Sequence, residues 1–154
     1  MKAYIFISVV AICLLSGCAA KQTNRYNQEA SLSDTLSFDP LAWKVIASFV
    51  NHDHNTMSTL YGNDTAIRYA RLGLPYPAGS IIALVTWSQR EDPHWHGALI
   101  PGPLQSIERV RFTAPGPLYE KYEGKPLTKT EAASAENVNP RIAYLTGQKA
   151  SVIP

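Results

Sequence analysis

The hydrophobic and polar positions of this 154-residue chain divide it into three parts. Residues 4–15 are almost entirely apolar, and residues 19–37 are mostly polar with no apolar period. From Asp39 onward, short apolar runs alternate with polar turns. The first apolar run is too short to cross a bilayer as a helix, which takes about 20 residues. The alternation of apolar runs and polar turns after it indicates one folded domain, at residues 38–154.

Capping signals predict two helices in this domain. Asp39 can cap free backbone amides and Pro40 suits the first helical position, so we expect a helix over residues 41–50. A second, short helix is expected over residues 65–72, capped by Asn63 or Asp64 and closed by Gly73. The last apolar stretch, residues 141–152, is expected to form a strand or a short helix.

The remaining apolar runs predict strands joined by short connections. Residues 80–87 form the strongest candidate, and residues 54–61 and 104–112 are further strands. Residues 94–100 are expected to form a strand or an extended loop, and residues 119–124 a turn. Strands without crossover helices favour an α+β fold, a small, mainly antiparallel β-sheet with two or three packed helices.

The N-terminus has the features of an export signal. A positive charge at Lys2, the short apolar core and small residues before a cut site are typical of secretory signals. Leu15-Ser16-Gly17-Cys18 also matches the bacterial lipobox, in which the cysteine thiol accepts a diacylglyceryl group and the chain is cut before it. We expect residues 1–17 to be a lipoprotein signal peptide, with an ordinary secretory signal as the alternative.

Lipidation would anchor the mature protein in a membrane. Two or three acyl chains, such as palmitate, on Cys18 hold a protein more firmly than one chain does. Residues 18–37 then form a flexible tether. Inner-membrane retention usually needs Asp after the cysteine, and Ala19 stands there instead. We therefore expect the protein to lie in the cell envelope, anchored in the outer membrane and facing the periplasm.

Cysteine and charge counts exclude several kinds of site. The chain has two cysteines, Cys13 in the predicted signal and Cys18, so the mature domain has no disulfide, no thiolate metal site and no Cys-x-x-Cys-His. Covalent c-type haem is therefore excluded. Loss of Lys2 leaves 13 basic against 12 acidic residues, which gives no reason to expect nucleic acid as a partner.

The four histidines form two His-x-His pairs, His52 with His54 and His94 with His96. Alternate residues of a strand share a face, so each pair could direct two imidazoles at one Cu²⁺ or Zn²⁺ ion. The alternative is that the first pair lies in a polar loop and the second flanks a packed Trp95.

Aromatic residues are the other candidate ligand-binding groups. They could line an apolar pocket, with the alternative that they fill the core of a small domain. The pocket candidates are Trp43, Trp87, Trp95 and Tyr61. No nucleophile elbow of the Gly-x-Ser-x-Gly kind is present, so no catalytic residue is assigned.

Several strings resemble the cytochrome P460 family. Two of them resemble the family as a whole, residues 56–66 and Tyr76-Pro77-Ala78-Gly79-Ser80 leading into Leu84-Val85-Thr86-Trp87. The others are similar to a lipoprotein branch of that family, residues 91–95, 97–98, 100–101, 141–142 and 149–154. The resemblance spans Asp39 to the C-terminus. It implies a mainly antiparallel β domain. Haem-bearing members of the family hold a c-type haem in this domain, and some of them oxidise hydroxylamine.

The chain departs from those members by lacking their haem motif. His94 and His96 lie well upstream of where it would fall, so neither takes over the axial-ligand role. We therefore expect an anchored P460-like domain that binds a small ligand or a metal ion. The alternatives are an oxidoreductase that acts on a small nitrogen compound through noncovalent haem or a metal, and an envelope interaction protein without a ligand.

Overall fold

A computed structural model describes residues 26–32, 36–130 and 135–151 of the chain. Six antiparallel strands form one sheet in chain order, β1 (Lys44–Asn51), β2 (Thr56–Gly62), β3 (Ile81–Glu91), β4 (Leu99–Thr113), β5 (Gly116–Glu123) and β6 (Thr128–Lys129). Among the described residues, two α-helices accompany them, α2 (Asp64–Leu72) and α3 (Ala135–Thr146). The expected α+β fold with a mainly antiparallel sheet is confirmed.

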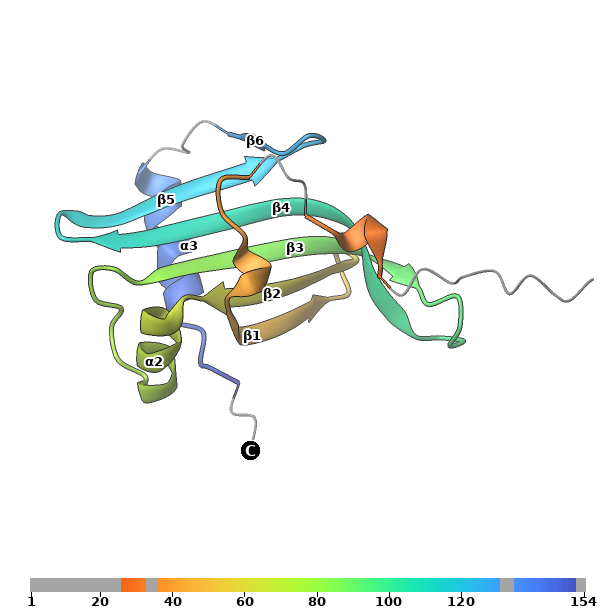
Figure 1. Ribbon diagram of the computed structural model, residues 1–154, viewed down its shortest axis with the longest axis horizontal. Coiled ribbons are helices and arrows are strands. Elements are labelled where there is room, and N and C mark those ends of the chain that lie inside the picture. Colours follow the sequence, from red (N-terminus) through yellow and green to blue (C-terminus); the bar gives the residue numbers. More distant parts are fainter. Residues whose placement is uncertain (1–25, 33–35, 131–134, 152–154) are drawn as a thin grey trace, which may run out of the picture.

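The sheet separates two hydrophobic layers. On one face, α2 and α3 pack over buried residues of strands β1 to β4, Ile46, Leu60, Ile82, Leu84 and Val110. On the other face, residues 26–32 and 36–43, which we call the N-terminal segment, lie across a second cluster built on Val85, Trp87 and Ile107. Figure 1 shows this segment in orange in front of the sheet, with α3 behind it. The sheet is thus covered on both faces.

The N-terminal segment contacts the sheet before the predicted domain boundary at residue 38. It contains two short 3₁₀ turns, η1 (Gln28–Ala30) and η2 (Pro40–Ala42). The indole N–H of Trp87 donates a hydrogen bond of 2.8 Å to the carbonyl of Ala30. Part of the segment assigned to the tether therefore packs on the domain.

The helix expected over residues 41–50 is a strand instead. Asp39 caps as predicted, with its carboxylate accepting from the Leu41 amide at 2.9 Å, but the turn ends at Ala42. From Lys44 the chain pairs with β2, and Ile46 becomes fully buried. β-Branched and aromatic side chains favour a pleated surface, and the cross-strand pairing outweighs the helix-start signal.

The turn expected over residues 119–124 is also wrong for all but its last residue, because residues 119–123 belong to β5 and the turn begins at Gly124. Its register sets Glu120 opposite Arg109 and Tyr119 opposite Val110, pairings that cannot be found from the segment alone. The last element is α3, which begins before the predicted residue 141 and ends at Thr146.

The short helix after β2 is confirmed. Asn63 accepts from the Ala66 amide at 2.9 Å, and Gly73 ends α2 in the left-handed conformation with φ of 64°. The same Asn63 oxygen also accepts from the Ile81 amide at 3.2 Å, and its amide group donates to the Gly79 carbonyl at 2.9 Å. One side chain therefore ties the helix start to the strand that follows the next loop.

Candidate functional site

The helix face of the domain contains a cavity of about 560 Å³, which we call the α2–α3 cavity. It lies where the end of α2, the loop before β3, the end of β4 and the C-terminal end of α3 meet. Its lining consists of Ala70, Gly73, Leu74, Pro75, Tyr76, Phe112, Ile142, Thr146, Gly147, Gln148 and Lys149. Because four separate elements form its wall, the fold as a whole creates the cavity.

Two stacked rings form one side of the cavity. The Tyr76 and Phe112 ring centroids lie 5.1 Å apart with an interplanar angle of 27°. The Tyr76 hydroxyl is buried and has no hydrogen-bond partner among the residues that the structure describes. Burial raises the pKa of this phenol, so it stays protonated at neutral pH and remains a hydrogen-bond donor.

The polar part of the lining comes from the end of α3 and the residues after it. The Gln148 side chain donates to the Tyr144 carbonyl at 2.8 Å and is thereby engaged. Lys149 is exposed, and within the described ranges no carboxylate forms an ion pair with it. The cavity therefore joins an aromatic wall to a lysine that has no ion-pair partner in the described part of the chain.

An ion pair between the partly exposed Arg141 and the buried Glu108 fixes α3 against the sheet. Arg141 donates two hydrogen bonds of 2.6 Å to the carboxylate of Glu108 on β4, and Tyr119 on β5 donates a third of 2.6 Å. Burial favours a raised pKa for Glu108, but these bonds and the charges of Arg141 and Lys121 outweigh it and lower that pKa. Since α3 carries Ile142 and Thr146 into the cavity wall, this ion pair positions the cavity.

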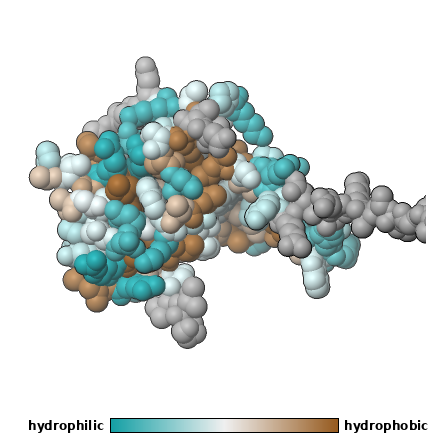
Figure 2. Space-filling model, in the orientation of Figure 1, coloured by the Kyte–Doolittle hydropathy of each residue, from teal (hydrophilic) through white to brown (hydrophobic). Residues whose placement is uncertain are grey.

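The opposite face gathers most of the predicted pocket aromatics. Trp87, 6% exposed, lies in the second core cluster, and Trp43 and Tyr61 pack against it half-buried. Trp43 also stacks on Phe38 with centroids 6.1 Å apart. Trp95 lies apart, on the loop between β3 and β4, and is 72% exposed. Hydrophobic residues seen as brown atoms surround the N-terminal segment on this face (Figure 2).

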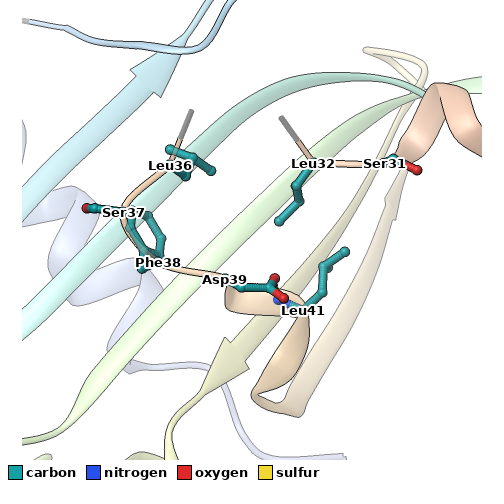
Figure 3. Close-up of a pocket in the computed structure, with 7 residues that line it drawn as sticks. All are labelled: Ser31, Leu32, Leu36, Ser37, Phe38, Asp39 and Leu41. Atoms are coloured by element: carbon teal, nitrogen blue, oxygen red, sulfur yellow. The ribbon is translucent and has the colours of Figure 1, made fainter. Parts of the chain in front are cut away.

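A second cavity, of about 570 Å³, opens along the N-terminal segment (Figure 3). Its lining consists of Ser31, Leu32, Leu36, Ser37, Phe38, Asp39 and Leu41, all from that segment. None of the four predicted pocket aromatics lines either cavity. Three of them fill the core of this face, and their role in ligand binding stays a prediction.

Charged groups on this face are already paired. Arg109 donates to Glu120 at 2.6 and 2.8 Å and lies 3.9 Å above the centroid of the Phe38 ring. Lys129 reaches the other oxygen of Glu120 at 2.8 Å. Burial alone would raise the pKa of Glu120, but its bonds to Lys129 and Arg109 lower it. This cluster therefore stabilises the fold, and Arg109 is not free to bind an anion.

The two histidine pairs lie in exposed turns. His52 and His54 occupy the turn between β1 and β2, and His94 and His96 the loop between β3 and β4, so neither pair projects from a strand. The Nδ1 atom of His54 lies 3.2 Å from the Asn51 side-chain oxygen. Among the described residues, no three His, Cys, Asp or Glu side chains are grouped to hold a metal. A site with fewer protein ligands stays a prediction.

The sequence of these strands also matches a known protein family. The family model of cytochrome P460 matches residues 41–115, which run from η2 through β4. The chain contains a cytochrome P460 family domain. No curated protein matches the chain. The residues after position 115, including α3 and Lys149, complete the α2–α3 cavity outside the matched part of the P460 domain.

The residues of this P460 domain do not fit a thioether-linked haem. The two cysteines, Cys13 and Cys18, both precede the described residues, and the chain has no Cys-x-x-Cys-His motif. The lining of the two cavities includes no histidine, methionine or cysteine. We therefore derive no chemistry through haem.

The predicted membrane attachment involves the N-terminal part of the chain. The predicted signal and the lipidation residue Cys18 lie outside the described residues. Within the described ranges, neither helix is long and apolar enough to span a bilayer.

The α2–α3 cavity was not predicted from the sequence. Tyr76 and Lys149 were visible only as one aromatic among many and one surface charge among many. No local signal could have joined them, since 73 positions of chain separate the two residues.

Proposed function

We propose that this protein is a lipid-anchored envelope protein whose cytochrome P460 domain binds a small ligand with an apolar body and one anionic group. The lipobox at Cys18 and the exported character of residues 1–17 support the anchor and the periplasm-facing location. The α2–α3 cavity supports the ligand.

The observation that carries this proposal is the presence, in one cavity, of a stacked aromatic wall and a lysine that forms no ion pair with any residue the structure describes. Ligand pockets are typically about 300–1,000 Å³ and mostly apolar, with a few polar groups that orient the ligand. The stacked Tyr76 and Phe112 rings offer such an apolar surface, and Lys149 offers a cation on a flexible stem. An aromatic carboxylate or sulfonate has matching chemistry.

The same groups favour binding over catalysis. Tyr76 is held protonated by the rise in its pKa, so it suits donation of a hydrogen bond better than acceptance of a proton. Its unpartnered hydroxyl would be satisfied if a ligand oxygen came within reach. We infer that the domain holds its ligand without changing it.

The test uses 8-anilinonaphthalene-1-sulfonate, an aromatic sulfonate whose fluorescence rises in apolar surroundings. The dye should bind the wild-type protein, and Lys149→Ala should weaken binding about tenfold, or about 1.4 kcal/mol. Thr146→Trp, which places a large ring in the wall, should abolish it. Lys44→Ala removes the same charge outside the cavity and should leave binding unchanged. Equal effects of the two lysine variants would refute the cavity assignment.

The same purified protein decides between this proposal and the two alternatives that need a cofactor. A Soret band would overturn the haem-free interpretation in favour of an oxidoreductase. About one copper or zinc per chain, lost in a His94→Ala, His96→Ala double variant, would make the metal site primary. A colourless, metal-free protein that binds the dye at the cavity supports the proposal.

A further inference from the structure

The loop between β3 and β4 presents an exposed tryptophan near the point where the described chain begins. Residues 92–98 form this loop, and Trp95 is 72% exposed, whereas Trp87 is 6% exposed. Leu99, the first residue of β4, is also exposed. One exposed apolar side chain is ordinary on a protein surface, so its position relative to the membrane anchor decides its meaning.

The N-terminal segment enters the domain at the stem of this hairpin. The Asn27 side chain donates to the Pro101 carbonyl at 2.5 Å, and Glu29 forms an ion pair with Arg90 at 3.5 Å. Arg90 pairs with Ile100 in the ladder between β3 and β4. Figure 1 shows the hairpin extending beyond the turn between β1 and β2, with η1 at its base. The chain therefore reaches the domain at the end where Trp95 projects.

The length of chain between this stem and the lipidation residue is short. Tyr26, itself 80% exposed, follows Cys18 by eight positions. A fully extended chain spans at most about 3.6 Å per residue, so the stem lies within about 29 Å of an anchored Cys18. A bilayer that holds the acyl chains is thus within reach of the hairpin tip.

We propose that the tip of the β3–β4 hairpin, with Trp95 at its centre, rests in the headgroup region of the membrane that holds the lipid anchor. This rests on the lipid anchor of the proposed function. Tryptophan has an apolar ring and one N–H donor, and it collects at membrane–water interfaces. The contact would orient the P460 domain with α2 and the α2–α3 cavity away from the lipid.

The charge of the tip indicates which force holds it there. Residues 91–98 include Glu91 and Asp92 but no lysine or arginine. The Asp92 carboxylate accepts from the His94 amide at 2.8 Å, which shapes the loop. Acidic groups do not attract anionic lipid, so the contact depends on the tryptophan ring and resists added salt.

The test uses the full lipidated mature protein in vesicles of phosphatidylethanolamine and phosphatidylglycerol. Its one native cysteine, Cys18, is blocked by lipid, so an introduced cysteine takes a nitroxide label alone. His96→Cys places the label beside Trp95, and Leu72→Cys places it on another exposed site, at the end of α2. Collision rates with oxygen, which concentrates in lipid, and with a water-soluble nickel complex are then measured.

The expected result is higher oxygen and lower nickel accessibility at position 96 than at position 72, unchanged in high salt. Adding Trp95→Ser to the His96→Cys protein should bring both rates to the aqueous values seen at position 72. Protein that floats with the vesicles but shows aqueous rates at position 96 overturns the hairpin contact and leaves the anchor standing. Low rates for both reagents indicate burial against protein and also overturn it. Protein that does not float overturns the anchor itself.

Discussion

The ion pair between Glu108 and Arg141 gives the sharpest test of how this domain holds its cavity together. Arg141→Met keeps most of the aliphatic volume and removes both hydrogen bonds of 2.6 Å to Glu108. The carboxylate, 6% exposed, would then keep its charge with only Tyr119 as donor. Breaking a buried ion pair costs about 3–5 kcal/mol. Because the Arg141 side chain is 38% exposed, water already screens part of the attraction, so we expect about 2–3 kcal/mol.

The effect should depend on pH in a defined direction. In the wild type the pKa of Glu108 lies below its ordinary value, so its contribution is present at neutral pH and lost as the pH falls through that lowered pKa. Without Arg141, burial dominates and the pKa of Glu108 rises above its ordinary value. Acid then neutralises the buried charge in the variant, so the difference in unfolding free energy should be smaller at pH 4 than at pH 7.

Urea unfolding followed by tryptophan fluorescence at the two pH values measures both quantities. Arg111→Met is the matched control, since Arg111 lies 3.4 Å from Glu120, which keeps Arg109 and Lys129 as partners. It should cost about 1 kcal/mol or less. If Arg141→Met costs no more than this control, or costs the same at both pH values, the ion pair does not have this role. A loosened α3 should also weaken dye binding at the α2–α3 cavity.

Three further results are expected. The wild type should lose stability as the pH falls below about 4.5, because the pKa values of both Glu108 and Glu120 are lowered in the folded state. Urea unfolding at a series of acid pH values checks this. Glu120→Gln should make the unfolding free energy less dependent on pH. Asn63→Ala should cost about 1–2 kcal/mol by removing the α2 cap and the bond to Gly79, whereas Asn63→Asp, which keeps the acceptor, should cost less in the same assay. Cys18→Ser should accumulate as an uncleaved or unlipidated precursor, and acylated mature protein from this variant would end the lipobox interpretation.

The sequence by itself determined the features that depend on neighbouring residues. Asn63 and Gly73 bound α2 because a cap acts within one turn of the helix. The apolar run at residues 80–87 predicted the central strand β3, which is buried along most of that stretch. Distinctive strings indicated the cytochrome P460 family, which the match over residues 41–115 supports.

Only the tertiary structure decided the elements and sites that depend on distant partners. Residues 41–50 follow a helix-start signal at Asp39 and Pro40, yet from Lys44 onward the chain pairs with β2 and Ile46 enters the core, which stabilises a strand. Residues 119–123 become part of β5 because β4 offers them a register that includes pairs of opposite charge. The α2–α3 cavity likewise exists because α3 is held on Glu108, which brings Lys149 to the same space as Tyr76 and Phe112. Packing between segments far apart in the chain creates that site, and no local pattern encodes it.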